Sequence, residues 1–383
     1  MAPDIAAVRA ELPGLANEVH LNSGGAGPLP LAAARAIAEA VEAGLAHGRM
    51  SLAAIEARYA RHEALRARVA RLLGVPSREV AITPSATAGM GLVIWGIDWR
   101  PGDEAVTTTH EHPGLLAPLA MLAERRGVRH HLVEPEGDLE AAVSAVAGPA
   151  TRLVALSHVS WTTGARLDVE GAARAAARSG ALVLVDGAQG AGAVPTEPPA
   201  LGAHAYALAG QKWLLGPEGV GALWLAPDTP QAVRPSLAGV PTGTDHGSDG
   251  RFRPHRDARR MEVSTMPEML LPGWSASLDW LEALGWDWIH GRTEAAAAAL
   301  RASLAEVPGV RLRTPPAAGG GLVAFTVDGH EPEAVVRALA TRGVQGRWIV
   351  RPPLARLSAG FFTDAGDIRK AVAALGEIVS RGG

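Results

Sequence analysis

The stretch Ala-Leu-Val-Leu-Val-Asp-Gly-Ala-Gln, residues 181–189, runs from an apolar segment into a carboxylate, a glycine and a carboxamide. A short apolar run bounded by turn residues is typical of a strand that is buried on both faces of a sheet. Ala-rich helical segments separate most of the other runs of this kind, which lie at residues 77–83, 104–109, 128–133, 152–158, 205–208 and 221–225. This alternation predicts an α/β fold with a mainly parallel sheet that helices cover on both faces.

The segments before and after this sheet predict helices and a second, smaller domain. Glu and Arg recur at helical spacing in residues 31–73, which predicts two helices around a break at residues 44–48. Further helices are predicted at residues 271–285 and 291–306. The elements predicted near the C-terminus suggest a small α+β domain and lie at residues 322–327, 333–341 and 364–380. We expect a large domain at residues 17–285 and a small domain formed by residues 1–16 and 286–383.

Residues 239–257 form the one long stretch with few apolar residues, and we expect an irregular loop there. A loop of that length is usually functional or disordered. Its basic residues favour an anionic or imidazole-bearing substrate if they face the site, and a solvated loop otherwise. These residues are His246, Arg251, Arg253, His255 and Arg256.

The composition excludes several classes of protein. The 383 residues carry a formal net charge of −3, which leaves no broad basic surface for nucleic acid. The chain contains no Cys, so it has no disulfide, no thiolate metal ligand and no thiol nucleophile of its own. The N-terminal residues lack the pattern of a signal peptide, and no apolar stretch reaches membrane-spanning length. We therefore expect a cytoplasmic protein that binds neither nucleic acid nor a membrane.

Lysine is almost absent, and its positions are informative. Lys370 lies in Asp-Ile-Arg-Lys-Ala-Val, which predicts a solvated helix face. Lys212 lies in the apolar, Gly-rich stretch Ala-Gly-Gln-Lys-Trp-Leu-Leu-Gly-Pro-Glu-Gly-Val-Gly, residues 209–221. Arg cannot replace lysine where a primary amine must lose a proton and attack a carbonyl. Apolar surroundings lower the pKa of an amine, which favours imine chemistry at Lys212. The alternative is that a general drift toward Arg spared both lysines at random.

Three features fall where an open α/β sheet places its ligand, beyond the carboxyl ends of the strands. Asp186 ends a predicted strand and is suited to pair with a protonated pyridine nitrogen, the alternative being a cap of the following turn. Ser85-Ala86-Thr87 at a strand-to-helix junction is suited to hold a phosphate, although Ser and Thr are also ordinary helix caps. Lys212 follows one further strand. Together, these three features predict a site for pyridoxal phosphate.

The order of motifs along the chain resembles the class V aminotransferases. The motifs are Ser-Ala-Thr (85–87), Glu-His (111–112), His-Val-Ser-x-x-Thr-Gly (158–164), Asp-Gly-Ala-Gln (186–189), Lys-Trp-Leu-x-Gly-Pro-x-Gly-x-Gly (212–221) and Arg-Leu-Ser (356–358). That family includes cysteine desulfurases, selenocysteine lyases, isopenicillin N epimerase-like proteins and the C–S lyase of ergothioneine synthesis. The resemblance implies the fold type I of pyridoxal phosphate enzymes, with a mainly parallel seven-stranded sheet, and a homodimer with shared active sites.

The resemblance also implies roles for the residues that would hold the cofactor. Lys212 would form the Schiff base and shuttle the proton at Cα, and Asp186 would pair with the pyridine nitrogen. Gln189 would contact the phenolic oxygen, and His112 would stack on the ring. Ala86 through its backbone, and Thr87, would bind the phosphate. Thr265 would reach the phosphate of the neighbouring subunit.

Other residues are implied to bind the substrate. Arg356 would hold the substrate α-carboxylate, a task that suits its planar fork, unless it is a surface Arg before a strand. Asn22 would lie in the segment that walls the pocket. Trp161 and Trp213 are candidates to stack on a ring-bearing substrate, unless they pack in the core. A metal cluster of His110, His112, His130 and His131 is the alternative for that group, and we predict no metal.

The chain also departs from the desulfurase pattern. Ala209 and Gln211 stand where desulfurases commonly have a Ser and a His as phosphate ligands. Gln211 can still donate a hydrogen bond to the phosphate. Trp161 stands where desulfurases have an Asn, so support of the phenolic oxygen would rest on Gln189 or Thr163. Above all, the chain has no Cys to accept sulfur as a persulfide, which excludes a thiol-based desulfurase reaction.

We therefore expect a C–S lyase that cleaves a cysteine S-conjugate or its sulfoxide by β-elimination, with release of pyruvate and ammonia. An aminotransferase and an amino-acid epimerase are the alternatives within the family. A fold retained as a non-catalytic binding module is the alternative outside it, and the intact set of Lys212, Asp186 and Gln189 argues against that.

Overall fold

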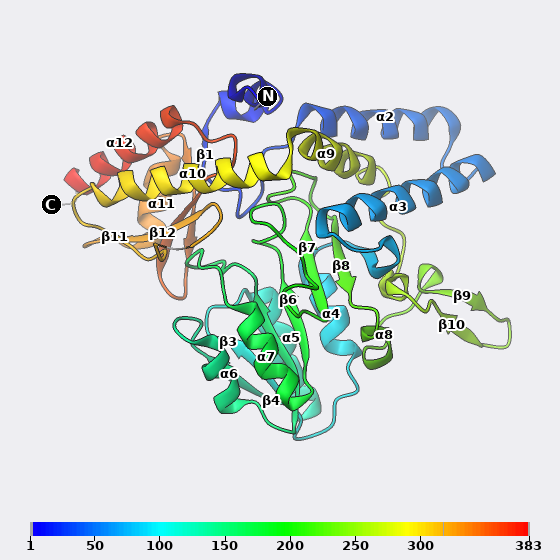
Figure 1. The fold of residues 1–383 in the computed structure, drawn as a ribbon. Helices are drawn as coiled ribbons and strands as arrows, with labels where there is room; N and C mark the ends of the chain where they lie inside the picture. Colours follow the sequence, from blue (N-terminus) through cyan, green and yellow to red (C-terminus); the bar gives the residue numbers. More distant parts are fainter. Residues whose placement is uncertain (1–2, 317, 382–383) are drawn as a thin grey trace.

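The computed structural model describes residues 3–316 and 318–381, and its centre is a seven-stranded sheet (Figure 1). β8 runs antiparallel to both of its neighbours, and the other pairs in the sheet are parallel, so the prediction of a mainly parallel α/β sheet is confirmed. In spatial order the strands are β2 (Val80–Thr83), β8 (Gly221–Leu225), β7 (Ala205–Ala209), β6 (Leu182–Asp186), β5 (Thr151–Ser157), β3 (Glu104–Thr108) and β4 (Arg129–Val133). The predicted strand at residues 77–83 begins later, because Ser77–Glu79 forms a 3₁₀ turn.

Helices cover both faces of this sheet, which explains why its strands are continuous apolar runs. Along β6, Val183 and Val185 pack in one buried cluster and Leu184 packs in another on the opposite face. The first cluster is closed by residues of α3 (Leu52–Leu73), α6 (Leu139–Val146), α7 (Val169–Ser179) and α9 (Leu271–Leu284). The second is closed by α4 (Ala86–Gly96) and α5 (Pro113–Arg126).

A four-stranded antiparallel sheet forms the centre of the C-terminal part of the chain. Its strands in spatial order are β11 (Val310–Leu312), β12 (Leu322–Val327), β15 (Leu354–Ser358) and β14 (Arg347–Ile349). The helices that contribute to its core are α10 (Trp286–Ala305), α11 (Pro332–Ala340) and α12 (Ala365–Arg381). The α+β character predicted for this part is present.

The N-terminal segment lies against the small sheet. β1 (Val19–His20) pairs in parallel with β13 (Val344–Gln345), and Asn22 forms a bridge to Ser358. The segment from β1 to Asn22 therefore joins the region built around β12 and β15, although it lies within the range predicted for the large domain. The domain boundary at residue 17 stays a prediction.

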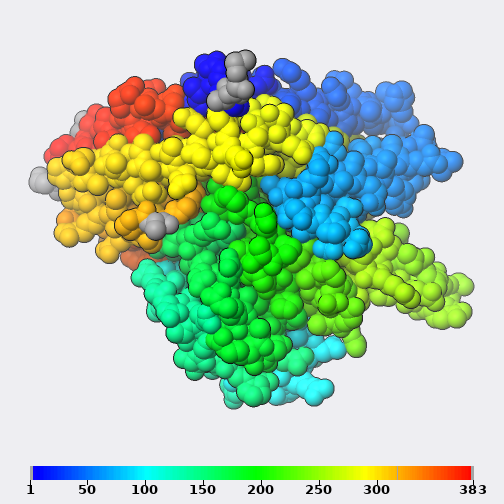
Figure 2. Space-filling view, viewed as in Figure 1, coloured from blue at the N-terminus to red at the C-terminus, as the bar shows by residue number. Residues whose placement is uncertain are grey.

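Two pairs of elements extend away from the body of the molecule (Figures 1 and 2). The first pair is α2 (Leu31–His47) and α3, which a glycine with φ 74° at Gly48 separates, as predicted. The second pair is the antiparallel hairpin of β9 (Gly243–His246) and β10 (Phe252–Pro254).

The hairpin corrects the prediction of an irregular loop at residues 239–257. Its side chains are mostly exposed, so no alternation of apolar and polar residues marks the two strands in the sequence. The remaining short elements are α1 (Ile5–Ala10), α8 (Thr229–Ala232) and 3₁₀ turns at Pro13–Ala16, Val240–Thr242 and Ala258–Met261. Within the described residues, no helix is both long and apolar enough to cross a membrane.

Candidate active site

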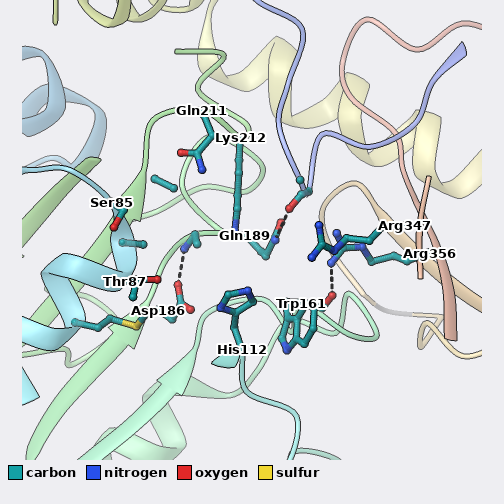
Figure 3. Close-up of a pocket in the computed structure, with 16 residues that line it drawn as sticks. Ser85, Thr87, His112, Trp161, Asp186, Gln189, Gln211, Lys212, Arg347 and Arg356 are labelled. Carbon is teal, nitrogen blue, oxygen red and sulfur yellow. Dashed lines mark hydrogen bonds between the residues drawn. The ribbon is translucent and has the colours of Figure 1, made fainter. Parts of the chain in front are cut away.

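A pocket of about 210 Å³ opens beyond the carboxyl ends of β6 and β7, and residues of the small sheet also line it (Figure 3). It is lined by Gly24, Gly25, Ser85, Ala86, Thr87, Met90, His112, Trp161, Asp186, Ala188, Gln189, Ala209, Gln211, Lys212, Arg347 and Arg356. These residues come from segments that lie far apart in the sequence. The carboxyl-end position agrees with the general location of ligand sites in open α/β sheets.

Lys212 reaches into this pocket from the loop after β7. The loop turns back on itself, since the backbone N of Gly216 donates to Gly210 O at 2.8 Å. A Cβ at Gly216 would lie 2.5 Å from Cδ1 of the buried Trp274, so the loop packs on the indole only with glycine there. Burial lowers the pKa of Lys212 to about 8; Arg356 and Arg347 also lower it, and the Asp186 charge opposes the shift.

Asp186 is the last residue of β6 and is buried. Its Oδ1 accepts a hydrogen bond from the backbone N of Ala188 at 2.9 Å, so the side chain also caps the following turn. Burial raises the pKa of Asp186, while the Lys212 charge and the Ala188 N–H oppose that shift. A cationic partner in the pocket would satisfy this carboxylate.

The N-terminus of α4 supplies a second polar wall. Ser85 is its N-cap, because its Oγ accepts from the backbone N of Ala88 at 3.1 Å. The first N–H groups of α4 lack intrahelical acceptors. Because Ser85, Ala86 and Thr87 line the pocket, this helix N-terminus favours an anion there. A Cβ at Gly114 would lie 2.4 Å from Thr87 Oγ1, so glycine at that position leaves room for the threonine hydroxyl.

His112 presents an uncharged ring to the pocket. It is the N-cap of α5, and its Nδ1 accepts from the backbone N of Gly114 at 3.0 Å, which places the ring proton on Nε2. Burial, followed by the charges of Lys212, Arg347 and Arg356, lowers the pKa of His112 to about 4. Its ring meets Trp161 edge to face, with centroids 4.9 Å apart and planes at 81°.

Gln189 is held by two hydrogen bonds that fix the orientation of its amide. Trp213 Nε1 donates to Gln189 Oε1 at 2.9 Å, and Gln189 Nε2 donates to Gly24 O at 2.9 Å. An indole N–H is only a donor, so the oxygen must face Trp213 and one hydrogen of Nε2 stays available. Trp213 itself packs among buried residues such as Val194 and does not line the pocket, so of the two alternatives for Trp213 core packing holds.

Arg356 is buried, contrary to the alternative of a surface Arg. It lies on β15, and its Nη1 donates to Trp161 O. Its Nε has no hydrogen-bond partner among the described residues. Burial and the charge of Arg347 lower the pKa of Arg356 to about 9. A Cβ at Gly24 would lie 3.0 Å from Arg356 Nη2, so glycine there lets the backbone approach the guanidinium.

Arg347 is a pocket residue that the sequence analysis missed. It lies on β14 directly opposite Arg356 on β15, so both guanidinium groups project from the same face of the sheet. The signal that would reveal Arg347 is this pairing, which requires residues 347–349 to be recognised as a strand. β14 and β15 are short, and the prolines of Arg351-Pro352-Pro353 between them argue against a strand hairpin when only the sequence is considered.

Besides Trp213, three predicted residues do not line this pocket. Asn22 shapes its wall indirectly, because Asn22 O accepts from the backbone N of Gly25 at 2.8 Å. Thr163 is buried beneath it, where Thr163 O accepts from Thr314 Oγ1 at 2.6 Å. Thr265 is exposed and belongs to a loop outside the pocket.

Two further polar groups of the pocket have no partner among the described residues, Gln211 Oε1 and Trp161 Nε1. No group of three or more His, Cys, Asp or Glu side chains within residues 3–316 and 318–381 is arranged to hold a metal ion. The pocket thus combines a partly buried amine, a buried carboxylate, a helix N-terminus and two guanidinium groups.

The family model described as aminotransferase class V matches residues 19–348. The chain belongs to the class V aminotransferases. A probable cysteine desulfurase of Pseudomonas aeruginosa is 34% identical over 335 residues, which cover 82% of this chain and 81% of that protein. An isopenicillin N epimerase of Streptomyces clavuligerus is 29% identical over 381 residues, which cover 93% of this chain and 94% of that protein.

Solved structures of class V relatives superpose on nearly the whole chain. The complex of the cystine C–S lyase C-DES with cysteine persulfide has a TM-score of 0.91 and 32% identity, and the match covers 96% of this chain and 99% of that one. A C-DES mutant with glycine covalently linked to its PLP cofactor has a TM-score of 0.93 and 31% identity, with 98% and 100% coverage. The cysteine desulfurase CsdA of Escherichia coli has a TM-score of 0.88 and 26% identity, with full coverage of both chains.

This class V protein is therefore an enzyme that depends on pyridoxal phosphate, as its sequence motifs predicted. The pocket fits that cofactor on structural grounds of its own. Lys212 has the lowered pKa that an amine needs to react with an aldehyde, and Asp186 lacks a cation in direct ion-pair contact among the described residues. The N-terminus of α4 offers N–H groups to a phosphate.

Proposed function

We propose that this class V enzyme is a C–S lyase that acts on cysteine S-conjugates, including disulfides and sulfoxides, by β-elimination. The overall reaction consumes water and releases a thiol or a related sulfur species, together with pyruvate and ammonia. The observation that carries the proposal is a pocket with a lysine base and two guanidinium groups in a chain without any Cys. The similarity to the cystine C–S lyase C-DES supports it further.

The residues of the pocket suit distinct positions around the cofactor. We propose that Lys212 bonds to it, that Asp186 pairs with its ring nitrogen, and that His112 stacks on its ring. Gln189 has one amide hydrogen available for the phenolic oxygen. The first N–H groups of α4, with Ala86, Thr87 and Gln211, would hold the phosphate.

Two arginines are suited to bind carboxylates of the substrate. Arg356 would bind the α-carboxylate that every amino acid carries, because its planar guanidinium can donate two hydrogen bonds to a carboxylate. Arg347 provides a second cation on the same face of the small sheet. A substrate with a second carboxylate, as in cystine, would use both guanidinium groups. Trp161 lies beside them with a free indole N–H for the substrate side chain.

Lys212 is positioned to move the proton at the substrate Cα. Pyridoxal phosphate supplies, when bound, a conjugated ring that accepts the electron pair left at Cα. The lowered pKa of Lys212 keeps part of its amine neutral near neutral pH, so Nζ can take this proton as a base. The bond from Cβ to sulfur then breaks, and the sulfur leaves with the bonding electrons.

The absence of Cys favours elimination over the desulfurase reaction. A thiol-based desulfurase needs a nucleophilic thiolate, and no side chain of these 383 residues supplies one. In β-elimination the sulfur departs by itself, so the enzyme needs a base and a carboxylate anchor but no nucleophile.

The holoenzyme tests this proposal with cystine, S-methylcysteine and S-methylcysteine sulfoxide, while pyruvate and ammonia are measured. We expect equal amounts of pyruvate and ammonia without any added keto acid. Lys212→Ala serves as the inactive control, and alanine serves as a substrate without a leaving group. A 2-oxo acid that forms only with a second keto acid would instead establish an aminotransferase. Loss of optical activity without pyruvate would establish an epimerase.

We further propose that the enzyme is a homodimer with shared active sites. Thr265 is exposed and outside the pocket of its own subunit, which suits a contact with the phosphate bound by a neighbour. The extended pair α2 and α3 also presents exposed apolar side chains, among them Leu45, Met50, Leu52 and Tyr59. Such side chains are typical of a surface that a second subunit covers.

A further inference from the structure

Glu111 is a buried carboxyl group to which the proposed mechanism assigns no role. It directly precedes His112, and the residue is only 3% exposed. Among the described residues it forms no ion pair, and no cation is among the groups that shift its pKa. A buried carboxylate without a cation is energetically costly, and such a group tends to keep its proton.

The neighbours of Glu111 can accommodate both of its protonation states. Its Oε1 accepts from Thr108 Oγ1 at 2.7 Å and from the backbone N of Ser157 at 3.0 Å. Its Oε2 lies against the Ser157 hydroxyl. That hydroxyl donates to an ionised Glu111, and a protonated Oε2 donates to the hydroxyl. Glu111 can therefore gain or lose a proton without losing a hydrogen-bond partner.

Ser157 links Glu111 to Asp186. Ser157 ends β5 and pairs in the parallel register with Asp186 at the end of β6. The backbone N of His158 also donates to Asp186 O at 2.9 Å. Glu111 lies three residues beyond the end of β3, and β5, which ends at Ser157, separates β3 from β6. Burial, and to a smaller extent the charge of Asp186, raises the pKa of Glu111.

The surroundings of the two carboxyl groups differ in a way that decides where a shared proton resides. Lys212 and the Ala188 N–H favour the charged form of Asp186. Glu111 has only neutral donors, and burial raises its pKa to about 7. When two nearby carboxyl groups interact, the one without a cation takes the proton first.

The other groups around Glu111 contribute little charge. β3 contributes the Thr108 hydroxyl, and β5 contributes the hydroxyl and N–H of Ser157. His112, next in the chain, is neutral because its pKa is lowered to about 4. Burial is therefore the main cause that raises the pKa of Glu111, and Asp186 on β6 is the one charged group, among the described residues, that adds to the shift.

We propose that Glu111 is a positioning residue that holds the proton of this carboxyl pair, so that Asp186 carries the single negative charge toward the cofactor ring nitrogen. This inference rests on the proposed role of Asp186. The same hydrogen bonds tie the loop that carries His112 to the strand end beside Asp186. They therefore fix the stacking residue and the ring-nitrogen partner relative to each other.

Infrared spectroscopy of the cofactor-free protein tests the proposal without any catalytic assay. We expect a protonated-carboxyl band at pH 6 that disappears as the pH rises through about 7. Glu111→Gln should lack this band, because the amide keeps a donor toward Ser157 but has no carboxyl proton. Glu79→Gln is the matched control. Glu79 is also buried and accepts from Trp224 Nε1 at 3.1 Å, yet it lies outside the pocket.

Asp186→Asn provides a second, independent measurement. Removal of the Asp186 charge should shift the disappearance of the Glu111 band to lower pH, because that charge raises the pKa of Glu111. A band that persists unchanged in Glu111→Gln, or a midpoint that does not move in Asp186→Asn, would overturn the proposal. Failure of the lyase assay with these infrared results intact would instead count against the proposed reaction alone.

Discussion

Arg347 and Arg356 face each other across the antiparallel strands β14 and β15, and both line the pocket that contains Lys212. Two cations on one face of a sheet repel each other, and the charge of Arg347 contributes to the lowered pKa of Arg356. Such a pair is stable when anions lie between or beside the two groups. The arrangement therefore agrees with the proposed binding of substrate carboxylates at the small sheet.

The two arginines should differ in their effect on substrate choice. Arg356→Ala should lower kcat/KM for every amino acid, by about 10- to 100-fold, since a charge-assisted hydrogen bond contributes about 1.5–3 kcal/mol. Arg347→Ala should affect cystine much more than S-methylcysteine, which has no second carboxylate. Arg313→Ala, which changes an exposed arginine outside the pocket, is the control. An equal loss for both substrates in Arg347→Ala would refute this assignment.

The attachment of the cofactor should depend on pH through Lys212. Only the neutral amine attacks an aldehyde, and the pKa of Lys212 is lowered to about 8. The rate at which the cofactor-free enzyme takes up pyridoxal phosphate should rise as the pH increases through about 8 and then level off. Asp186→Asn should move this midpoint to lower pH, because the Asp186 charge raises the pKa of Lys212. Stopped-flow absorption measures both curves, and a midpoint above 10 would contradict the burial of this amine.

The covalent attachment should be confined to one lysine. Borohydride reduction of the holoenzyme, followed by peptide mapping, should place the pyridoxyl group on Lys212. Lys370→Arg should leave labelling and activity unchanged, because Lys370 lies on α12 and outside the pocket. Label on Lys370, or on neither residue, would contradict the assignment.

The loop that carries Lys212 should be sensitive to a single methyl group. Gly216→Ala would place a Cβ 2.5 Å from Trp274, and it should weaken cofactor binding and lower the free energy of unfolding by about 1–3 kcal/mol. Gly291→Ala is the matched substitution, since nothing lies within 4 Å of a Cβ there and the residue is inside α10. That change should raise the free energy of unfolding by about 0.5–1 kcal/mol. Denaturant titration and the affinity for the cofactor distinguish the two variants. Equal effects of both substitutions would contradict the close packing of residue 216 on Trp274.

Shared active sites can be tested by complementation between two inactive variants. Lys212→Ala lacks the base, and Thr265→Ala lacks the proposed contact to the neighbour's phosphate. In a mixed dimer, one site receives an intact Lys212 from one subunit and an intact Thr265 from the other. Mixed dimers should therefore regain up to half of the specific activity of the native enzyme. If Thr265→Ala alone binds the cofactor as tightly as the native enzyme, Thr265 has no such role.

The alternation of short apolar runs with helical segments was enough to predict the α/β class and most strands of the large sheet. That prediction succeeded because strands buried on both faces, such as β6, must be continuously apolar. It was least accurate at the hairpin of β9 and β10, whose mostly exposed side chains leave no periodic pattern. It also missed β14, which at three residues is too short to show one.

The sequence by itself determined the chemistry that this enzyme has available. Three of its properties can be recognised in the sequence without a structure. They are a lysine in an apolar loop, a carboxylate at a strand end and the absence of Cys. The tertiary structure alone decided which charges meet. Arg347 faces Arg356 because of the register of β14 and β15, and Ser157 links Glu111 to Asp186 because the register of β5 and β6 pairs Ser157 with Asp186. Register depends on the packing of the whole sheet, and no local pattern encodes it.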